Sequence, residues 1–363
     1  MTTTCVELPL VEAPAPPRSF ISLTELERLC RQRPTNYLIE GLLPADDVHV
    51  AVGDSGLGKT PWAYQLGLCV ATGEQFLGYP TRQGRVIYLD LENGPDAILN
   101  VAKSLCEHIG IKPFPDEFLV RSDEVIPELP HVVEEHRPDL IIIDTLRPFR
   151  PTAEKHNDEM GVFLNDLRST ARSAHCTILL VHHIRKPGEL GVPALEDMPV
   201  SEWLYQAAGA RALINQTNTR IALDRQRNAS GRDAALVMKF FVKMKGETGP
   251  LYLERVCDSE GEPTGYSRMA GARLLGNADQ EAAYAHLPER FRFKEAERVY
   301  GKTSDPTRKF LLKCIGAGIL EQSSRGTYCK VIPIEKIERV ENNPEGQVVR
   351  AVSSHAALYS IEK

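Results

Sequence analysis

A glycine-rich stretch with one lysine and one threonine is the part of the sequence whose residue types and spacing most clearly imply chemistry. Residues 53–60 read Gly-Asp-Ser-Gly-Leu-Gly-Lys-Thr and fill every position of the phosphate-binding loop (P-loop) pattern G-x-x-x-x-G-K-[ST]. Glycines let backbone N–H groups converge on phosphate oxygens at the start of a helix, where the helix dipole also favours anions. We therefore predict a nucleotide-phosphate site; a chance glycine-rich turn is the alternative.

Three residues of this segment have individual roles. Lys59 is expected to reach the β- and γ-phosphates, and the Thr60 hydroxyl is expected to hold Mg²⁺. Pro61 suits the first turn of the following helix, where no N–H is needed. The expected cofactors are therefore ATP and Mg²⁺. The predicted nucleotide-binding residues are Gly53, Asp54, Ser55, Gly56, Leu57, Gly58, Lys59, Thr60 and Pro61.

Two carboxylates follow apolar runs further along the chain. Asp144 ends the run 140–143 and is the candidate second ligand of Mg²⁺, with a plain strand-terminating Asp as the alternative. Glu92 ends the run 86–91 and is the candidate base that orients and deprotonates the attacking water. Asp90 is the weaker candidate for the base because it lies inside the strand. A solvated carboxylate is the alternative interpretation of Glu92.

A pair of histidines follows a further apolar run, 177–181. His182 and His183 are followed by Arg185 and Lys186. Polar side chains at this strand end could sense the γ-phosphate and transmit its loss to the segment that follows. Two surface histidines without such a role are the alternative.

Elements that would position these residues alternate along the chain. Short runs that are almost entirely apolar, typical of strands buried on both faces of a parallel sheet, alternate with helical patterns. The carboxyl ends of parallel strands share one crevice, so Lys59, Glu92 and Asp144 are expected to lie together. The predicted strands are 48–52, 85–91, 140–144 and 177–181, and the predicted helices are 59–72, 95–109 and 158–175.

The pattern changes after His183. Residues 185–200 are rich in Pro, Gly and acidic side chains and predict a long mobile loop. The runs 219–223, 236–242 and 251–256 predict strands that close the sheet. A disordered leader is expected at 1–19, a linker at 263–279 and an uninformative tail at 334–363.

The region 280–333 predicts a smaller unit. Two helical stretches, 293–300 and 306–316, followed by a hairpin at 318–331, fit the winged-helix plan. Ten Lys or Arg side chains against five Asp or Glu make residues 286–331 locally basic. This charge favours contact of helix 306–316 and the Arg325 wing with duplex DNA; docking of a protein is the alternative.

Bulk properties limit the classes of function. The 363 residues are 42% hydrophobic and 25% charged, which is typical of a globular protein. The formal net charge of −6 means that any contact with nucleic acid must use local patches. Eight scattered cysteines without a C-x-x-C pair predict reduced thiols. No signal peptide or membrane-spanning run is recognisable, so a soluble cytoplasmic protein without a membrane partner is expected.

Taken together, these motifs resemble the RecA/DnaB-like ATPases, most closely the branch that contains the plasmid replicative helicase RepA. The resemblance covers about residues 38–225 and implies a RecA-like P-loop NTPase core over 20–262. The phrases that match are 53–60, 88–93, 140–145 and 181–186.

Further properties come from the resemblance alone. It implies a ring of identical subunits, commonly a hexamer, with ATP between subunits and single-stranded DNA in a central channel. It also implies Glu92 as the catalytic base and His183 as the strand-end sensor. A ring would reconcile the acidic net charge with DNA binding, because only the channel lining need be basic.

One departure from the family pattern concerns the arginine that reaches a neighbouring subunit's nucleotide. Relatives place an Arg-Gly-Ser-Ser-like phrase after the mobile loop, whereas residues 207–211 read Ala-Ala-Gly-Ala-Arg. Arg211 is the candidate catalytic arginine, displaced from the usual position. The alternatives are Arg220, Arg225 and Arg227.

Three functions are compatible with these features. The first is an ATP-hydrolysing DNA helicase or translocase in replication of a plasmid, phage or genomic island. The second is an ATP-dependent DNA-binding regulator or loader, which switches assembly with nucleotide and separates no strands. Kinase or small-molecule transferase activity is the third, and fold analogy alone does not choose among them.

Overall fold

The structure of the protein is a computed structural model. It describes residues 21–32, 37–121, 128–150, 156–185, 193–209, 211–226, 235–243, 245–257, 263–269, 278–316, 319–324 and 326–330. The leader expected at 1–19, the tail expected at 334–363, Lys186, Arg227 and Arg325 lie outside these residues. None of the helices within the described ranges combines the length and the apolar character needed to span a membrane.

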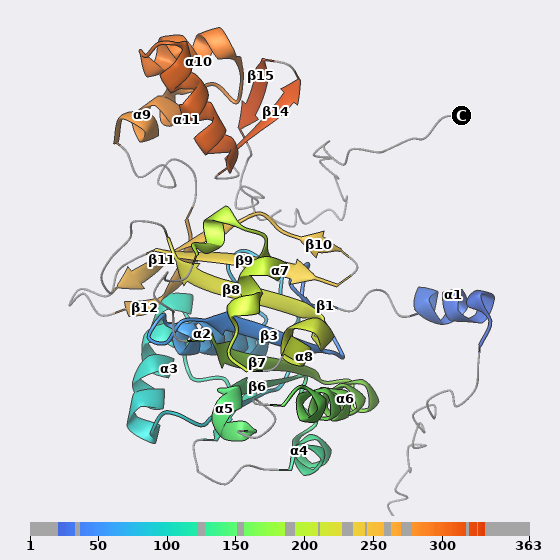
Figure 1. Ribbon diagram of the computed structural model, residues 1–363. Helices are drawn as coiled ribbons and strands as arrows, with labels where there is room; N and C mark the ends of the chain where they lie inside the picture. Colours follow the sequence, from blue (N-terminus) through green and yellow to red (C-terminus); the bar gives the residue numbers. More distant parts are fainter. Residues whose placement is uncertain are drawn as a thin grey trace, which may run out of the picture. The chain divides into compact units, whose positions relative to one another are not determined.

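A mixed sheet organises the larger part of the chain (Figure 1). Within the described residues it has ten strands in the order β12-β11-β9-β8-β3-β7-β6-β4-β5, with β10 beside β9. Neighbours from β8 to β5 are parallel, and neighbours from β8 to β12 are antiparallel. The strands are β3 (Val48–Gly53), β4 (Val86–Asp90), β5 (Phe118–Arg121), β6 (Leu140–Asp144), β7 (Thr177–His183), β8 (Thr219–Arg225), β9 (Leu236–Val242), β10 (Gly246–Glu247), β11 (Leu251–Cys257) and β12 (Pro263–Arg268).

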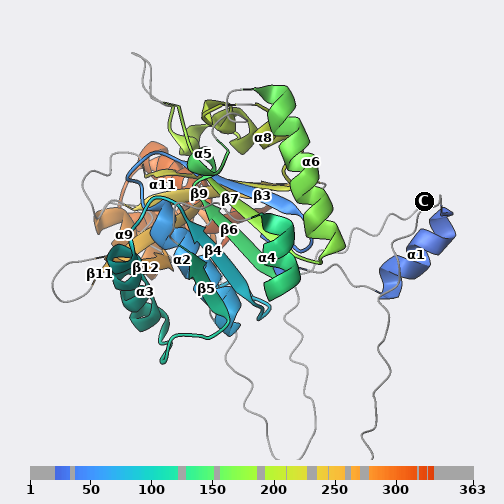
Figure 2. The same ribbon diagram turned by 90° about the horizontal axis from the view of Figure 1, so that it is seen from below.

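Both faces of this sheet are covered by helices, which explains its apolar strands. In β6, Leu140 and Ile142 belong to one hydrophobic cluster, and Ile141 and Ile143 belong to the other. Figure 2 shows α2 and α3 on one side of the strands and α6 on the other. The helices of this region are α2 (Lys59–Thr72), α3 (Pro95–Ile109), α4 (Leu129–His136), α5 (Leu146–Phe149), α6 (Asn157–Ser173), η1 (Leu195–Asp197), α7 (Val200–Trp203), η2 (Leu204–Gln206) and α8 (Arg211–Gln216).

Helix α2, which follows the phosphate-binding loop, is buried on nearly every side. Its cluster includes residues of the antiparallel strands, among them Met238 of β9 and Leu253 of β11. Tyr266 of β12 also packs there. The curled sheet therefore encloses the helix, which is why its sequence is apolar all round instead of amphipathic.

The expectation of an α/β core with a mainly parallel sheet is confirmed, and α2, α3 and β6 have the predicted bounds. The expected linker is wrong over 263–268, because these residues form β12, which pairs with β11. The expected mobile loop contains η1 and the start of α7 where the structure describes it. His182 and His183 lie within β7 and do not follow it. A separate pair, β1 (Tyr37–Ile39) and β2 (Leu43–Pro44), and the helix α1 (Leu23–Gln32) precede the core.

A second, small hydrophobic core lies in the C-terminal region. It is formed by residues such as Phe291, Phe310 and Leu320. Its elements are α9 (Ala278–His286), β13 (Arg290–Arg292), α10 (Phe293–Tyr300), α11 (Ser304–Gly316), β14 (Leu320–Ser324) and β15 (Thr327–Lys330). The three strands form an antiparallel sheet in the order β13-β15-β14. This succession agrees with the winged-helix plan. The helix α9 and the strand β13 are additional to the two helices and the hairpin that the sequence predicted.

Candidate active site

The phosphate-binding loop connects β3 to α2. Gly56 and Gly58 adopt φ angles of 69° and 101°, in the left-handed region that favours glycine. Lys59, the first residue of α2, folds back over the loop, and its Nζ donates to the Asp54 carbonyl at 2.7 Å. Burial lowers the pKa of Lys59, while the carboxylates of Asp144, Glu92 and Asp54 oppose that shift. The loop therefore contains two glycines in the left-handed region and carries the Lys59 ammonium against one of its own carbonyls.

Asp144 ends β6 and is almost completely buried. One of its oxygens, Oδ2, accepts a hydrogen bond of 2.7 Å from Tyr88 on the adjacent strand β4. Burial raises the pKa of Asp144 to about 6. The hydroxyl of Tyr88 and, to a smaller extent, the nearby hydroxyl of Thr60 oppose this rise in the pKa of Asp144.

The surroundings of the other Asp144 oxygen, Oδ1, indicate whether the site can hold Mg²⁺. Oδ1 is buried and has no hydrogen-bond partner among the described residues. A buried, unpaired carboxylate oxygen beside a threonine hydroxyl suits a hard cation that prefers oxygen ligands. Thr60 and Asp144 would hold the ion, and Mg²⁺ bound there would neutralise charge on the nucleotide phosphates. The described residues contain no cluster of three His, Cys, Asp or Glu side chains suited to a metal.

Glu92 lies just beyond the end of β4, and its side chain is partly exposed to solvent. Its Oε1 accepts a 2.7 Å hydrogen bond from the hydroxyl of Thr145, the residue after Asp144. His183 Nε2 lies 3.5 Å from the same oxygen. A partly exposed carboxylate held on one oxygen can accept a proton from water.

His183 connects Glu92 to the phosphate-binding lysine. Its Nδ1 is 3.1 Å from Lys59 Nζ, on the opposite side of the ring from Glu92. The structure therefore brings Lys59, Glu92 and His183 together, with Asp144 and Thr60 beside them.

Asp90 has a different role from that of a base. It is buried at the end of β4 and accepts hydrogen bonds from the backbone N–H of Glu92 and of Asn93, at 3.2 and 2.9 Å. The Asn93 amide and the Tyr64 hydroxyl donate to it as well. Asp90 thus fixes the turn that presents Glu92.

Sequence reasoning missed three side chains of this site. Thr145 could have been found as a polar residue directly after a strand-end acid. Tyr88 and Tyr64 gave no such signal, because aromatic residues in apolar runs are usually core residues. Their rings stack at 3.9 Å, and each hydroxyl binds one of the buried acids Asp144 and Asp90.

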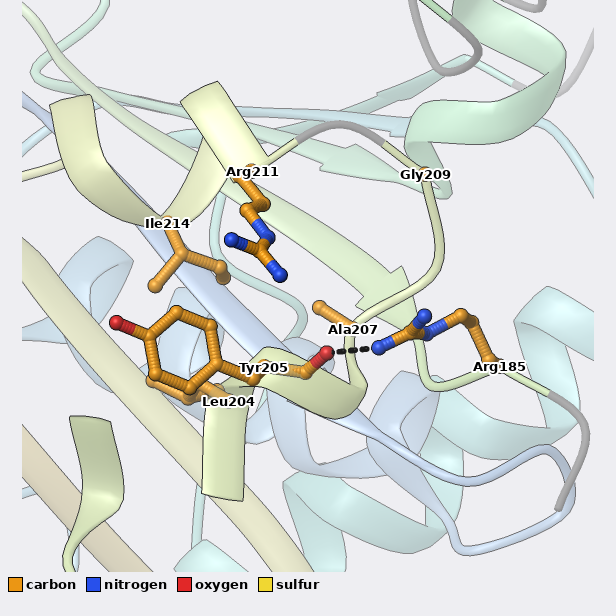
Figure 3. Close-up of a pocket in the computed structure, with 7 residues that line it drawn as sticks. All are labelled: Arg185, Leu204, Tyr205, Ala207, Gly209, Arg211 and Ile214. Carbon is orange, nitrogen blue, oxygen red and sulfur yellow. Dashed lines mark hydrogen bonds between the residues drawn. The ribbon is translucent and has the colours of Figure 1, made fainter. Parts of the chain in front are cut away.

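Arg211 does not join this group. It begins α8 and lines a cavity of about 50 Å³, with room for only a few water molecules, and its guanidinium lies over the Tyr205 ring (Figure 3). Arg185, at the opposite side of the cavity in Figure 3, donates to the Tyr205 carbonyl. Of the alternatives, Arg220 packs over Phe241 and donates to the Asn215 carbonyl, and Arg225 is exposed at the end of β8.

The end of β7 is bonded to the segment that leads to this cavity. Ala208 N–H donates to the His183 carbonyl, and the His182 ring contacts the Ala208 carbonyl, each at 2.9 Å. Burial lowers the pKa of His182 to about 4, so this ring is neutral and donates through Nε2. None of the six cysteines that the structure describes in full forms a disulfide.

A phosphate-binding loop between β3 and α2, with acids at the carboxyl ends of adjacent parallel strands, defines a P-loop ATPase with a RecA-like α/β core. A family model described as an AAA domain matches residues 14–189. The chain is also similar to a KaiC-like protein from the hyperthermophilic archaeon Pyrococcus horikoshii OT3, at 16% sequence identity. That match covers 64% of this chain and 94% of the other, with a TM-score of 0.41. The strand order of the main sheet defines the fold. The narrower resemblance to the RepA branch stays a prediction.

Proposed function

We propose that the protein is an ATP-driven DNA helicase or translocase that acts in replication of a plasmid, phage or genomic island. One observation carries the proposal: His183 lies between Lys59 and Glu92, and its backbone carbonyl accepts a hydrogen bond from Ala208. The residue placed to sense the γ-phosphate is therefore bonded to a segment outside the nucleotide site. A motor needs such a connection between phosphate and moving parts.

The connection extends over several hydrogen bonds. Arg185 N–H donates to the Gln206 carbonyl at 2.7 Å, and Ile184 forms an antiparallel bridge with Ala207. A shift of β7 by nucleotide would therefore move residues 206–208 as a unit. These residues lead to the cavity that contains Arg211.

A homo-oligomeric ring, most simply a hexamer, completes the proposal. Arg211 lies in its own cavity, away from the nucleotide-binding group of the same chain, so a stimulatory arginine would come from a neighbouring subunit. The central channel would hold single-stranded DNA. Only the residues that line it need be basic, which is compatible with the net charge of −6.

The C-terminal unit supplies a surface for duplex DNA. In α11, Phe310, Leu311 and Cys314 are buried, while Arg308, Lys309 and Lys313 are exposed. Basic side chains on one face of the second helix of a helix-turn-helix are placed for phosphate contact.

This basic helix also favours the second candidate function. An ATP-dependent regulator or loader would bind duplex DNA through α11 and use nucleotide to switch assembly without separating strands. A protein-docking role for the same unit is a further outcome that binding measurements would reveal.

Hydrolysis assays distinguish the two functions. A helicase should show ATPase activity stimulated by single-stranded DNA, together with ATP-dependent strand separation. A regulator should bind duplex DNA, assemble with ATP and turn over slowly.

The Glu92→Gln variant should abolish strand separation, whereas Glu107→Gln, which changes an exposed acid on α3, should not. Native mass spectrometry with and without ATP should give a closed ring for the motor, and a dimer would contradict it.

A further inference from the structure

The hairpin of β11 and β12 reaches the outer side of the phosphate-binding loop. Strand β12 is the last strand of the sheet order, four strands from β3, and the curl of the sheet brings it against α2 and α3 (Figure 1). Arg255 of β11 and Tyr266 of β12 point at the loop. Neither residue belongs to the nucleotide-binding motif.

Each of the two side chains donates a hydrogen bond to a carbonyl of the loop. Arg255 donates through Nη2 to the Leu57 carbonyl. The Tyr266 hydroxyl donates to the Gly58 carbonyl at 2.9 Å. The approach is so close that a Cβ at Gly58 would lie 2.1 Å from the Tyr266 hydroxyl. Glycine is required here both by the space and by φ = 101°.

Tyr266 is itself held firmly on α2. Its backbone N–H donates to Gln65 Oε1, and the Gln65 amide donates back to the Tyr266 carbonyl, both at 2.8 Å. Both residues are buried. The His108 ring of α3 covers Gly265 and lies 3.3 Å from the Tyr266 carbonyl. The hydroxyl is therefore a fixed point from which the loop can be aligned.

Peptide planarity shows what these contacts do. The C=O of one residue and the N–H of the next belong to one planar trans unit and point in opposite directions. Fixing the Leu57 carbonyl toward Arg255 thus points the Gly58 N–H away from Arg255, into the loop. The Gly58 carbonyl accepts both the Tyr266 hydroxyl and the Trp62 N–H of the first helical turn, and its orientation does the same for the Lys59 N–H.

We infer that Arg255 and Tyr266 are positioning residues of the nucleotide site. They hold the Gly58 and Lys59 N–H groups, before nucleotide binds, in the orientation that phosphate oxygens require. A preorganised donor set binds an anion without the cost of ordering the loop at the moment of binding. The Arg255 guanidinium adds positive charge beside the same loop. This inference rests on the proposed binding of nucleotide at residues 53–60.

The test compares two Tyr→Phe substitutions in the full-length protein. Tyr266→Phe removes only the hydroxyl that reaches Gly58, and Tyr252→Phe makes the same change on β11, away from the loop. We expect Tyr266→Phe to weaken MgADP binding and raise the KM for ATP about 3- to 10-fold, the usual effect of one hydrogen bond. The kcat should stay within about twofold, because Glu92 and its partners are untouched. Tyr252→Phe should change none of these values.

A merely structural role of Tyr266 would lower the melting temperature of the nucleotide-free protein and leave the affinity for MgADP unchanged at 20–25 °C. That result would overturn the inference. Arg255→Gln is the second variant, at a half-buried position, and should also weaken MgADP binding. If Lys59→Ala loses MgADP binding while both hairpin variants bind like the wild type, the inference alone is wrong. If Lys59→Ala binds MgADP as tightly as the wild type, the proposed nucleotide site itself is wrong.

Discussion

His183 Nδ1 lies 3.1 Å from Lys59 Nζ. A lysine ammonium can only donate hydrogen bonds, so Nδ1 is the acceptor and the ring proton resides on Nε2. That nitrogen faces Glu92 Oε1 at 3.5 Å. A histidine thus connects the phosphate-binding lysine to the candidate base. We expect an anion that attracts the Lys59 ammonium to weaken its contact with His183 and so to alter the surroundings of Glu92.

Replacement of His183 tests this connection. In His183→Ala, the affinity for MgADP should change less than about threefold, because the loop and Lys59 remain. The kcat for ATP should fall about 10- to 100-fold, in the range of a lost proton-transfer or positioning group. His131→Ala, an exposed histidine of α4, is the control. Equal kcat values for the two variants would show that His183 has no role in hydrolysis.

Glu92→Gln keeps the size of the side chain and its bond from Thr145 but removes the base. Hydrolysis should fall about 10²- to 10⁴-fold, the usual contribution of general-base catalysis. Binding of MgATP should persist, so nucleotide should accumulate on the variant. Stopped-flow or filter-binding measurements of bound ATP after mixing check both outcomes. Hydrolysis within twofold of the wild type would assign the base elsewhere.

Burial of Asp144 predicts a pH effect on the stability of the nucleotide-free protein. Its pKa is about 6 in the fold against 3.8 for the unperturbed group, so protonation favours the folded state. The stabilisation is complete below about pH 4 and is lost as the pH rises through about 6. Asp144→Asn should therefore raise the free energy of unfolding at pH 7.5 by about 1–3 kcal/mol. Thermal melting without metal, at pH 4.5 and 7.5, checks that the gain is much larger at the higher pH.

The same carboxylate must be ionised to hold Mg²⁺. We expect Mg²⁺-dependent hydrolysis to decline as the pH falls through about 6, provided that the fold is intact there. Higher Mg²⁺ concentrations should move the midpoint to lower pH, because the cation competes with the proton. A pH profile that does not respond to Mg²⁺ would argue against Asp144 as the ligand.

The basic side chains on the exposed face of α11 predict that binding of duplex DNA weakens as the salt concentration rises. Arg308→Ala and Lys309→Ala should each weaken binding and reduce the slope of log K against log salt by about 1. Lys103→Ala, an exposed lysine of α3, removes the same charge elsewhere and should leave the slope unchanged. Fluorescence anisotropy at several salt concentrations measures the slope. Equal slopes for all variants would favour a protein-docking role of the C-terminal unit.

Local patterns were sufficient to predict much of the core. The apolar run that ends at Asp144 and the glycine-rich loop before α2 have strong periodic or compositional signals, so their elements were placed correctly. Strand ends in a parallel sheet meet at one edge, which brought Lys59, Glu92 and Asp144 together as expected.

Contacts between distant segments could not be predicted in this way. Residues 263–268 contain Pro263 and Gly265, which usually indicate a linker, yet they form β12. Gly265 is there because a Cβ would lie 2.4 Å from the His108 ring. The Gln65–Tyr266 pair joins residues 201 positions apart. No spacing rule connects such segments, because the packing of the whole sheet around α2 decides them.

The most direct test of the account is nucleotide binding and hydrolysis by Lys59→Ala beside the wild type. Equilibrium titration with MgADP and release of phosphate from ATP, on the same folded preparations, give both quantities. We expect the wild type to hydrolyse ATP, and the variant to lose hydrolysis and bind MgADP at least about tenfold more weakly, since a desolvated lysine–phosphate pair contributes more than 1.4 kcal/mol. Equal affinity of the two proteins, or no hydrolysis by the wild type, would contradict an ATPase site at this loop.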